Sequence, residues 1–98
     1  MLSACEMMIS YLNEVAQIAQ EKKSTPGLTS RVKGFCSLQA REVVRLAREV
    51  CGGNGIILDN HVMKSLCDLE AYYTYEGTYE TNMLVSGREL TGGLAAFK

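Results

Sequence analysis

The sequence lacks the features that mark metal-binding or nucleic-acid-binding proteins. Its 98 residues include one proline, one histidine and no tryptophan, and its four cysteines show no C-x-x-C spacing. So few candidate ligands make a zinc site improbable, and we expect no metal. Ten basic and eleven acidic residues give a net charge of −1 without a basic stripe. We therefore expect no nucleic-acid partner.

Long apolar runs and targeting signals are also missing. No run approaches the roughly 20 apolar residues that span a bilayer, so we expect no membrane span. The first eight residues carry no basic n-region and no Arg-rich amphipathic pattern, and they indicate the interior of a helix and not a signal or transit peptide. Three of the four cysteines occupy apolar positions of expected helices, which indicates reduced, buried thiols.

The sequence does contain clear helical periodicity. Apolar residues recur at i, i+3, i+4 and i+7 from residue 2 to about residue 22, which predicts a first long helix ended by Thr25-Pro26-Gly27. A second long helix is expected to start near Thr29 or Ser30, either of which could serve as its N-cap. It should end at Gly52-Gly53-Asn54-Gly55, because glycine tolerates positive φ.

Two shorter helices are expected next, from His61 to about Leu69 and from Tyr79 to Leu90, the latter closed by Gly92-Gly93. Their expected N-caps are polar residues, namely Asp59 or Asn60 for the third helix and Thr78 for the fourth. The only strand-like run, residues 71–75, is short and isolated. We predict an all-α helical bundle with two long helices, one short helix and one C-terminal helix.

The segment Tyr75-Glu76-Gly77-Thr78 is the best candidate for chemistry. A carboxylate between an aromatic ring and a glycine suits proton abstraction, because the ring can exclude water and the glycine lets a substrate approach the backbone. Taken alone, such a segment is more often a solvated loop. The glycine-rich segment at 52–55, about two dozen residues earlier, is likewise more often a helix end and turn when taken alone.

Together the two segments, at their observed separation, resemble the C-terminal end of the flavin-dependent acyl-CoA dehydrogenases. The matching stretches are residues 25–27, 47–56, 61–62, 68–71, 74–78 and 86–92. Within the family the chain is most similar to glutaryl-CoA dehydrogenases and to short-chain acyl-CoA oxidases. The resemblance covers about the last quarter of a family member. It implies that residues 1–98 form the C-terminal helical domain, without the N-terminal helical domain, the middle β-domain and the first helix of the four-helix bundle.

The resemblance implies a role for each residue of the second segment. Glu76 would be the base that removes the α-proton of an acyl-CoA thioester, while a hydride leaves the β-carbon for the flavin. The backbone N–H of Glu76 would also donate a hydrogen bond to the thioester oxygen. Gly77 and Tyr75 would lie against the substrate, and Thr78 would contact FAD.

The resemblance also implies FAD as cofactor, with further contacts outside this segment. Its adenine-dinucleotide part, usually bound by a neighbouring subunit, would meet Glu49, Val50, Cys51, Gly52 and Gly53. Phe97 lies close to a further FAD contact near the C-terminus, although one extra residue after Arg88 disturbs that alignment. A homo-oligomer, dimer or tetramer, is therefore expected.

Three functions are open at this point. The first is oxidation of glutaryl-CoA to crotonyl-CoA with decarboxylation, using electron-transferring flavoprotein or oxygen as electron acceptor. The second is a short-chain acyl-CoA dehydrogenase or oxidase without decarboxylation. The third, from a different class, is a non-catalytic helical module that self-associates or docks onto larger subunits. The family implies the mitochondrial matrix, with the peroxisome as the alternative.

Overall fold

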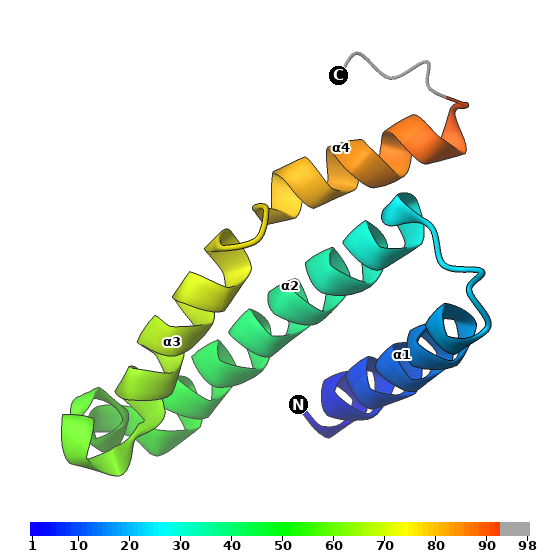
Figure 1. The fold of residues 1–98 in the computed structure, drawn as a ribbon. Helices are drawn as coiled ribbons and strands as arrows, with labels where there is room; N and C mark the ends of the chain where they lie inside the picture. The colour runs from blue at the N-terminus through cyan, green and yellow to red at the C-terminus, as the bar shows by residue number, and fades with distance from the viewer. Residues whose placement is uncertain (93–98) are drawn as a thin grey trace.

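A computed structural model describes residues 1–92 of the chain, and in that range it contains helices and no strand (Figure 1). The elements, in chain order, are α1 (Leu2–Gln20), α2 (Pro26–Cys51), the short 3-10 turns η1 (Gly52–Ile56) and η2 (Leu58–Asn60), α3 (Val62–Thr74) and α4 (Tyr79–Leu90). This order confirms the all-α prediction of two long helices followed by two shorter ones.

Helix α2 is the spine of the molecule, and α1, α3 and α4 all pack against it. In Figure 1, α3 and α4 follow one another along one side of α2, and α1 lies on its other side. The result is elongated, with principal extents of 48 × 29 × 18 Å. The connection between α3 and α4 therefore lies beside the first half of α2, and it contains the predicted base.

Helix α2 begins earlier than the sequence predicted. Thr25 is its N-cap, with a hydroxyl that accepts a hydrogen bond from the Leu28 N–H at 3.2 Å, and Pro26 is its first residue. The predicted start at Thr29 or Ser30 was wrong. Proline suits the first helical position, because that residue needs no N–H partner and its φ is already helical. Helix α1 already ends at Gln20, so Pro26 begins α2 and does not end the first helix as predicted.

Helix α3 is longer than predicted and is capped differently. It continues to Thr74, so the strand-like run is helical except for Tyr75, which follows the helix in an extended conformation. Neither Asp59 nor Asn60 caps it, because both belong to η2, and the residue before the helix is His61 in a left-handed conformation with φ of +64°. The Asn60 side chain donates instead to the Asn54 carbonyl at 2.8 Å. The fourth helix begins as predicted, with the Thr78 hydroxyl accepting from the Thr81 N–H.

The apolar core of the described residues is small. It consists of Val15 on α1 with Val32 and Cys36 on α2, surrounded by half-buried side chains, among them Tyr11 and Phe35 in edge-to-face contact at 5.5 Å. Many large apolar side chains stay exposed, and several of them lie on α1 (Leu2, Met7, Ile9 and Leu12). The chain thus leaves apolar helix surface without a partner of its own.

The cysteines bear out the buried-thiol expectation only in part. All four are free thiols; Cys36 is buried and Cys5 half-buried, but Cys51 and Cys67 are exposed. Three of the four were expected to be buried, so the expectation was wrong for at least one of the two exposed cysteines. None of the helices within residues 1–92 is both long enough and apolar enough to cross a bilayer.

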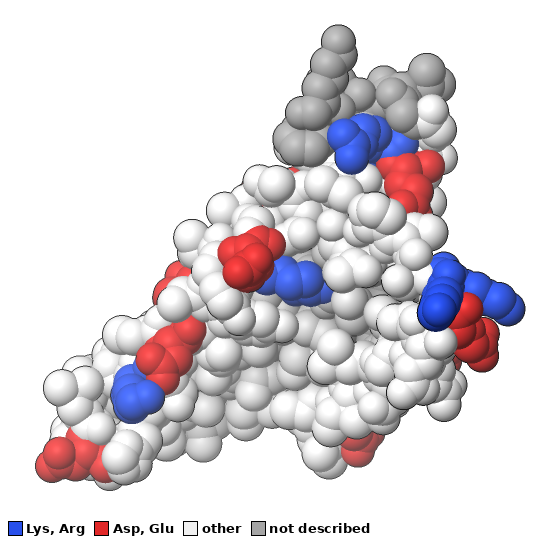
Figure 2. Space-filling model, in the orientation of Figure 1, with Lys and Arg blue, Asp and Glu red and all other residues white. Residues whose placement is uncertain are grey.

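Charged side chains on the face shown in Figure 2 alternate in sign and do not gather into one patch. Arg41 of α2 pairs with Glu70 of α3 at 2.7 Å, and Lys64 pairs with Asp68 within α3 at 2.6 Å. Exposed pairs of this kind contribute about 0–1 kcal/mol each, so helix packing and not charge holds the elements together.

Candidate active site

Glu76 lies in the short connection between α3 and α4, in a backbone conformation that is costly for a residue with a side chain. Its φ is +56°, and that of Gly77 is +91°. A non-glycine residue in this left-handed region costs about 1–2 kcal/mol, so the surrounding structure must hold it there. Strain of this kind is concentrated at functional sites, which favours a role for Glu76 beyond joining two helices.

Two side chains hold the connection in place by donating hydrogen bonds to the carbonyl oxygen of Gly77. The Lys33 ammonium of α2 donates to it at 2.7 Å, and the Asn82 amide of α4 donates to it at 3.0 Å. Asn82 is buried and also donates to the Thr78 carbonyl at 3.1 Å. A Cβ atom at position 77 would lie 3.2 Å from the Asn82 amide nitrogen, so glycine is needed there both for its φ and for space.

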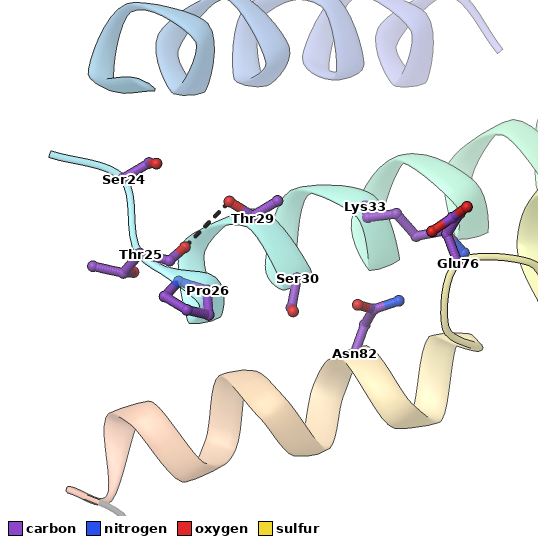
Figure 3. A pocket seen from close by; sticks show the side chains of 8 residues that line it. All are labelled: Ser24, Thr25, Pro26, Thr29, Ser30, Lys33, Glu76 and Asn82. Carbon is purple, nitrogen blue, oxygen red and sulfur yellow. Dashed lines mark hydrogen bonds between the residues drawn. The ribbon is translucent and has the colours of Figure 1, made fainter. Parts of the chain in front are cut away.

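The Glu76 carboxylate lines an open groove of about 590 Å³ between the start of α2 and the start of α4 (Figure 3). Lys33 and Glu76 are the two charged residues of its lining and lie at one end, with Ser24 and Thr25 at the other end. The remaining lining residues are Pro26, Thr29, Ser30 and Asn82. Most of the lining residues are polar types, and the groove has one carboxylate and one ammonium group at the same end.

The aromatic neighbour does not enclose Glu76 within this chain. The Tyr75 ring packs edge-on against Tyr72 with centroids 6.0 Å apart, is 57% exposed and does not line the groove. Glu76 is itself exposed. The expectation that Tyr75 shields the carboxylate from water is therefore wrong for the chain alone, because one exposed ring covers too little of its surroundings.

Lys33 occupies a more enclosed position than its charge suggests. Its ammonium nitrogen lies 5.6 Å and 5.8 Å from the ring centroids of Tyr72 and Tyr75. Burial lowers the pKa of Lys33, and the nearby Glu76 carboxylate opposes this by favouring the charged form. The ammonium is thus a positive group held against two rings and two carbonyls, beside the carboxylate.

Thr78, the predicted FAD contact of this segment, already has a structural task. Its hydroxyl is the N-cap of α4, accepting from the Thr81 N–H at 3.2 Å and donating to the Thr81 hydroxyl at 3.0 Å. Thr78 is half-buried, so part of the residue remains accessible to solvent. The structure therefore brings Tyr75, Glu76, Gly77 and Thr78 together with Lys33 and Asn82.

The other predicted FAD segment, Glu49 to Gly53, is not brought to this site. It lies at the end of α2 and in η1, next to the start of α3, whereas Glu76 follows the end of α3. The 13 residues of α3 separate the two by about 20 Å, at about 1.5 Å per residue. One chain thus presents two separate candidate surfaces. Phe97 lies outside the described residues.

The exposed end of α2 has one feature that the chain's own folding does not explain. Val50, Cys51, Gly52 and Gly53 are all exposed, and Val50 is 77% exposed. The φ of +60° with ψ of −137° at Gly52 favours glycine, but Gly53 has neither a positive φ nor any atom within 4 Å of where a Cβ would be. A glycine at 53 fits a surface that another molecule approaches closely, and so it is compatible with the FAD contact that the sequence suggested.

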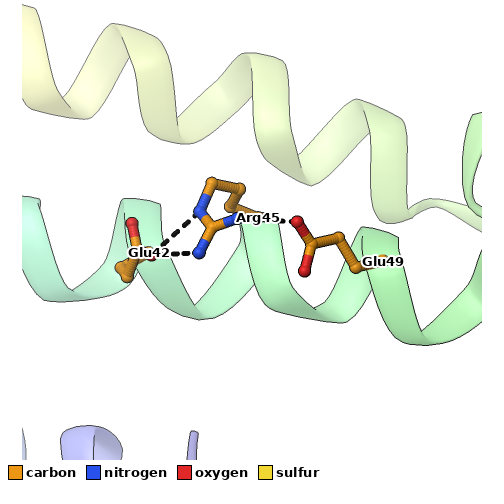
Figure 4. A network of polar contacts seen from close by, with 3 residues as sticks. All are labelled: Glu42, Arg45 and Glu49. Carbon is orange, nitrogen blue, oxygen red and sulfur yellow. Dashed lines mark hydrogen bonds and ion pairs between the residues drawn. The ribbon is translucent and has the colours of Figure 1, made fainter.

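The Glu49 side chain is less available for a ligand contact than its neighbours, because it already has an ion-pair partner. It pairs with Arg45 at 2.7 Å, and Arg45 also binds Glu42 one turn earlier (Figure 4). All three side chains are about half exposed, so the network is a weak surface cluster that a ligand could rearrange. No group of three or more His, Cys, Asp or Glu side chains within the described part of the chain is placed to hold a metal ion.

Three residues that position the site were missed by sequence reasoning: Lys33, Asn82 and Glu89. The Glu89 carboxylate of α4 accepts hydrogen bonds from the Thr25 hydroxyl at 2.7 Å and from the Gly27 N–H at 2.8 Å. These bonds lower the pKa of Glu89 and tie the start of α2 to the end of α4. The first N–H groups of a helix lack partners inside it, so an acceptor near the start of α2 could be expected. Glu89 is far away in the sequence, so nothing local identified it as that acceptor.

Comparisons with known proteins identify the family to which this fold belongs. Residues 1–91 match the family model described as "Acyl-CoA dehydrogenase, C-terminal domain". The chain belongs to this family. A crystal structure of glutaryl-CoA dehydrogenase from Mycobacterium smegmatis superposes on this acyl-CoA dehydrogenase domain with a TM-score of 0.86, at 32% sequence identity over 92% of the chain. The match covers 23% of that protein's chain, so the domain described here spans about a quarter of its length.

Proposed function

We propose that residues 1–98 form the C-terminal domain of a flavin-dependent acyl-CoA dehydrogenase, and that Glu76 removes the α-proton of the acyl-CoA thioester. One observation carries the proposal: an exposed carboxylate lies on a strained connection and lines an open groove. Membership of the acyl-CoA dehydrogenase family supports it.

The residues of this chain would divide the work of proton abstraction. The α-proton of a thioester is only weakly acidic, so the base must be aimed at the α-carbon and the developing enolate must receive hydrogen bonds. The Glu76 carboxylate would take the proton, and its backbone N–H would donate to the thioester oxygen. FAD, when bound, accepts the hydride that leaves the β-carbon. Gly77 would leave room for the thioester, with Tyr75 at the edge of the acyl site.

FAD would meet this chain at both of its candidate surfaces. Thr78 would contact it near the base, whereas the exposed segment from Glu49 to Gly53 would meet the adenine-dinucleotide part of a second FAD, bound by a neighbouring subunit. The separation of about 20 Å along α3 supports this division, as does the unexplained glycine at 53. Phe97 would add a contact near the C-terminus. The arrangement requires a homo-oligomer, a dimer or a tetramer.

For the substrate we propose glutaryl-CoA, converted to crotonyl-CoA with release of carbon dioxide. The similarity to the glutaryl-CoA dehydrogenase of Mycobacterium smegmatis supports this choice. A short-chain acyl-CoA dehydrogenase or oxidase without decarboxylation is the alternative. Electron-transferring flavoprotein or oxygen would accept the electrons. The proposed compartment is the mitochondrial matrix, with the peroxisome as the alternative.

The test is anaerobic mixing of the complete flavin-loaded protein with glutaryl-CoA or butyryl-CoA. Bleaching of the flavin band by either substrate is expected, and carbon dioxide release from glutaryl-CoA separates the two specificities. Glu76→Gln should abolish bleaching, whereas Glu80→Gln, an exposed acid in the first turn of α4, should not. A Glu76→Gln protein that bleaches at the wild-type rate would remove Glu76 as the base.

A second candidate function is a non-catalytic helical module that only associates with itself or with larger subunits. The small core and the exposed apolar side chains of α1 favour it. Analytical ultracentrifugation of the purified chain distinguishes the cases: a well-folded monomer with no tendency to associate would remove this candidate.

A further inference from the structure

Lys33 lies outside every stretch that carries the family resemblance, yet it reaches the connection that contains the base. Its ammonium donates to the Gly77 carbonyl at 2.7 Å and to the Tyr73 carbonyl at 3.3 Å. The first carbonyl belongs to the residue after Glu76, and the second belongs to the last turn of α3, where helix carbonyls lack partners inside the helix. One side chain from α2 therefore ties the end of α3 to the turn that follows it.

The surroundings keep this ammonium where it is. A cation near the C-terminal end of α3 is favoured by the helix dipole, and the rings of Tyr72 and Tyr75 lie within 6 Å of it. Its aliphatic stem starts from the half-buried face of α2, between buried Val32 and Gly34. Lys33 is thus fixed at both ends, by its helix and by its carbonyl acceptors.

We propose that Lys33 is the positioning residue of Glu76: its hydrogen bond to the Gly77 carbonyl keeps the Glu76–Gly77 backbone left-handed, and this directs the carboxylate toward the groove. Asn82 donates to the same carbonyl at 3.0 Å and fixes it from the side of α4. Figure 3 shows Lys33 and Glu76 at the same end of the groove. The inference rests on the proposed function, because the direction of the carboxylate matters only if Glu76 takes a proton.

The alternative is that Lys33 merely stabilises the helix packing. Loss of a purely structural lysine would lower the unfolding temperature but would leave the folded site unchanged. Loss of a positioning residue loosens the turn within a folded protein and slows the proton-abstraction step without weakening substrate binding. The two roles therefore predict different results for two measurements. One is the bleaching rate compared with the acyl-CoA affinity, and the other is local hydrogen exchange at residues 74–78.

The test compares Lys33→Met and Lys33→Arg in the complete flavin-loaded protein. Lys64→Met is the matched control, because Lys64 is an exposed lysine on α3 that pairs with Asp68. Two quantities are measured: hydrogen–deuterium exchange of residues 74–78, and anaerobic flavin bleaching by acyl-CoA over a range of concentrations. In Lys33→Met we expect hydrogen exchange at residues 74–78 to become at least tenfold faster and flavin bleaching to become at least tenfold slower. The acyl-CoA Kd should stay within twofold of wild type. Lys33→Arg should recover part of both, and Lys64→Met should match wild type.

Wild-type exchange at residues 74–78 in folded Lys33→Met would overturn the proposal, and so would a wild-type bleaching rate. If Lys33→Met loses helicity by circular dichroism, Lys33→Gln is measured in its place, with the same expected directions and the same overturning results. A wild-type protein that no acyl-CoA bleaches would instead contradict the proposed function. In that case the exchange measurement alone decides whether Lys33 holds the turn.

Discussion

At the scale of single residues, two glycines of this chain have opposite tasks. Gly77 has a φ of +91° and faces the Asn82 amide, so Gly77→Ala should lower the free energy of unfolding by about 1–2 kcal/mol. Gly53 has no positive φ, and a Cβ there would meet no atom within 4 Å. Gly53→Ala should therefore change the free energy of unfolding by less than about 0.5 kcal/mol. Urea unfolding of the two variants checks both values, and equal effects would contradict this account of the turn.

Gly53→Ala also separates folding from cofactor binding. If Gly53 is glycine because FAD approaches it closely, the alanine variant should fold normally but bind FAD about tenfold more weakly in the complete oligomer. Gly87→Ala is a suitable control, because its Cβ would also meet no atom within 4 Å and it lies on α4, away from η1. Equilibrium dialysis with FAD provides the measurement, and unchanged affinity in Gly53→Ala would remove this contact.

The residues of the site differ in how far the sequence could predict them. Glu76, Gly77 and Thr78 are adjacent, so a local motif reveals them together, and the cap formed by Thr78 follows from local chemistry. Lys33 is 44 residues from Gly77, and nothing in its own neighbourhood predicts that it binds a carbonyl there. Residues that act through tertiary contacts have no local signal, and only the fold reveals them.

At the scale of helices, the carboxylate of Glu89 caps α2 from α4, and this contact should depend on pH. Hydrogen bonds from Thr25 and Gly27, in that order of importance, lower its pKa below the ordinary value of 4.5, and Arg31 adds to the effect. The stabilisation should therefore be complete above pH about 4.5 and should disappear as the pH falls through the lower pKa of the folded state. Glu89→Gln should reduce the unfolding temperature at pH 7 more than at pH 3. Glu14→Gln, an exposed acid on α1, is the control, and a pH-independent difference for Glu89→Gln would contradict the cap.

The helix boundaries show which helix ends can be predicted from nearby residues alone. Helix α4 was predicted correctly because its cap and its apolar pattern agree. Helix α3 was predicted too short, because its tyrosines have strand-like preferences that tertiary contacts override: Lys33 lies over Tyr72, and Arg41 lies 4.4 Å from the Tyr73 ring centroid. Such contacts with α2 cannot be read from residues 71–75 alone.

At the scale of the whole molecule, the small core predicts association. Val15, Val32 and Cys36 are the buried apolar side chains among residues 1–92, whereas Leu12 of α1 is 49% exposed. Leu12→Glu should shift the purified chain toward monomer in sedimentation velocity while circular dichroism stays helical. Asn13→Glu, an exposed position next to it, should leave the association unchanged. Equal sedimentation of both variants would show that the face of α1 containing Leu12 takes no part in association.

The most direct test of the central claim isolates proton abstraction from electron transfer. The complete flavin-loaded protein is incubated in deuterium oxide with an acyl-CoA that has no β-hydrogen, and exchange at its α-carbon is followed by NMR. Because such a thioester cannot lose a hydride, only a base is needed for exchange. Wild-type protein should exchange the α-protons at least a hundredfold faster than Glu76→Gln. Equal exchange by the two proteins would contradict the assignment of Glu76 as the base.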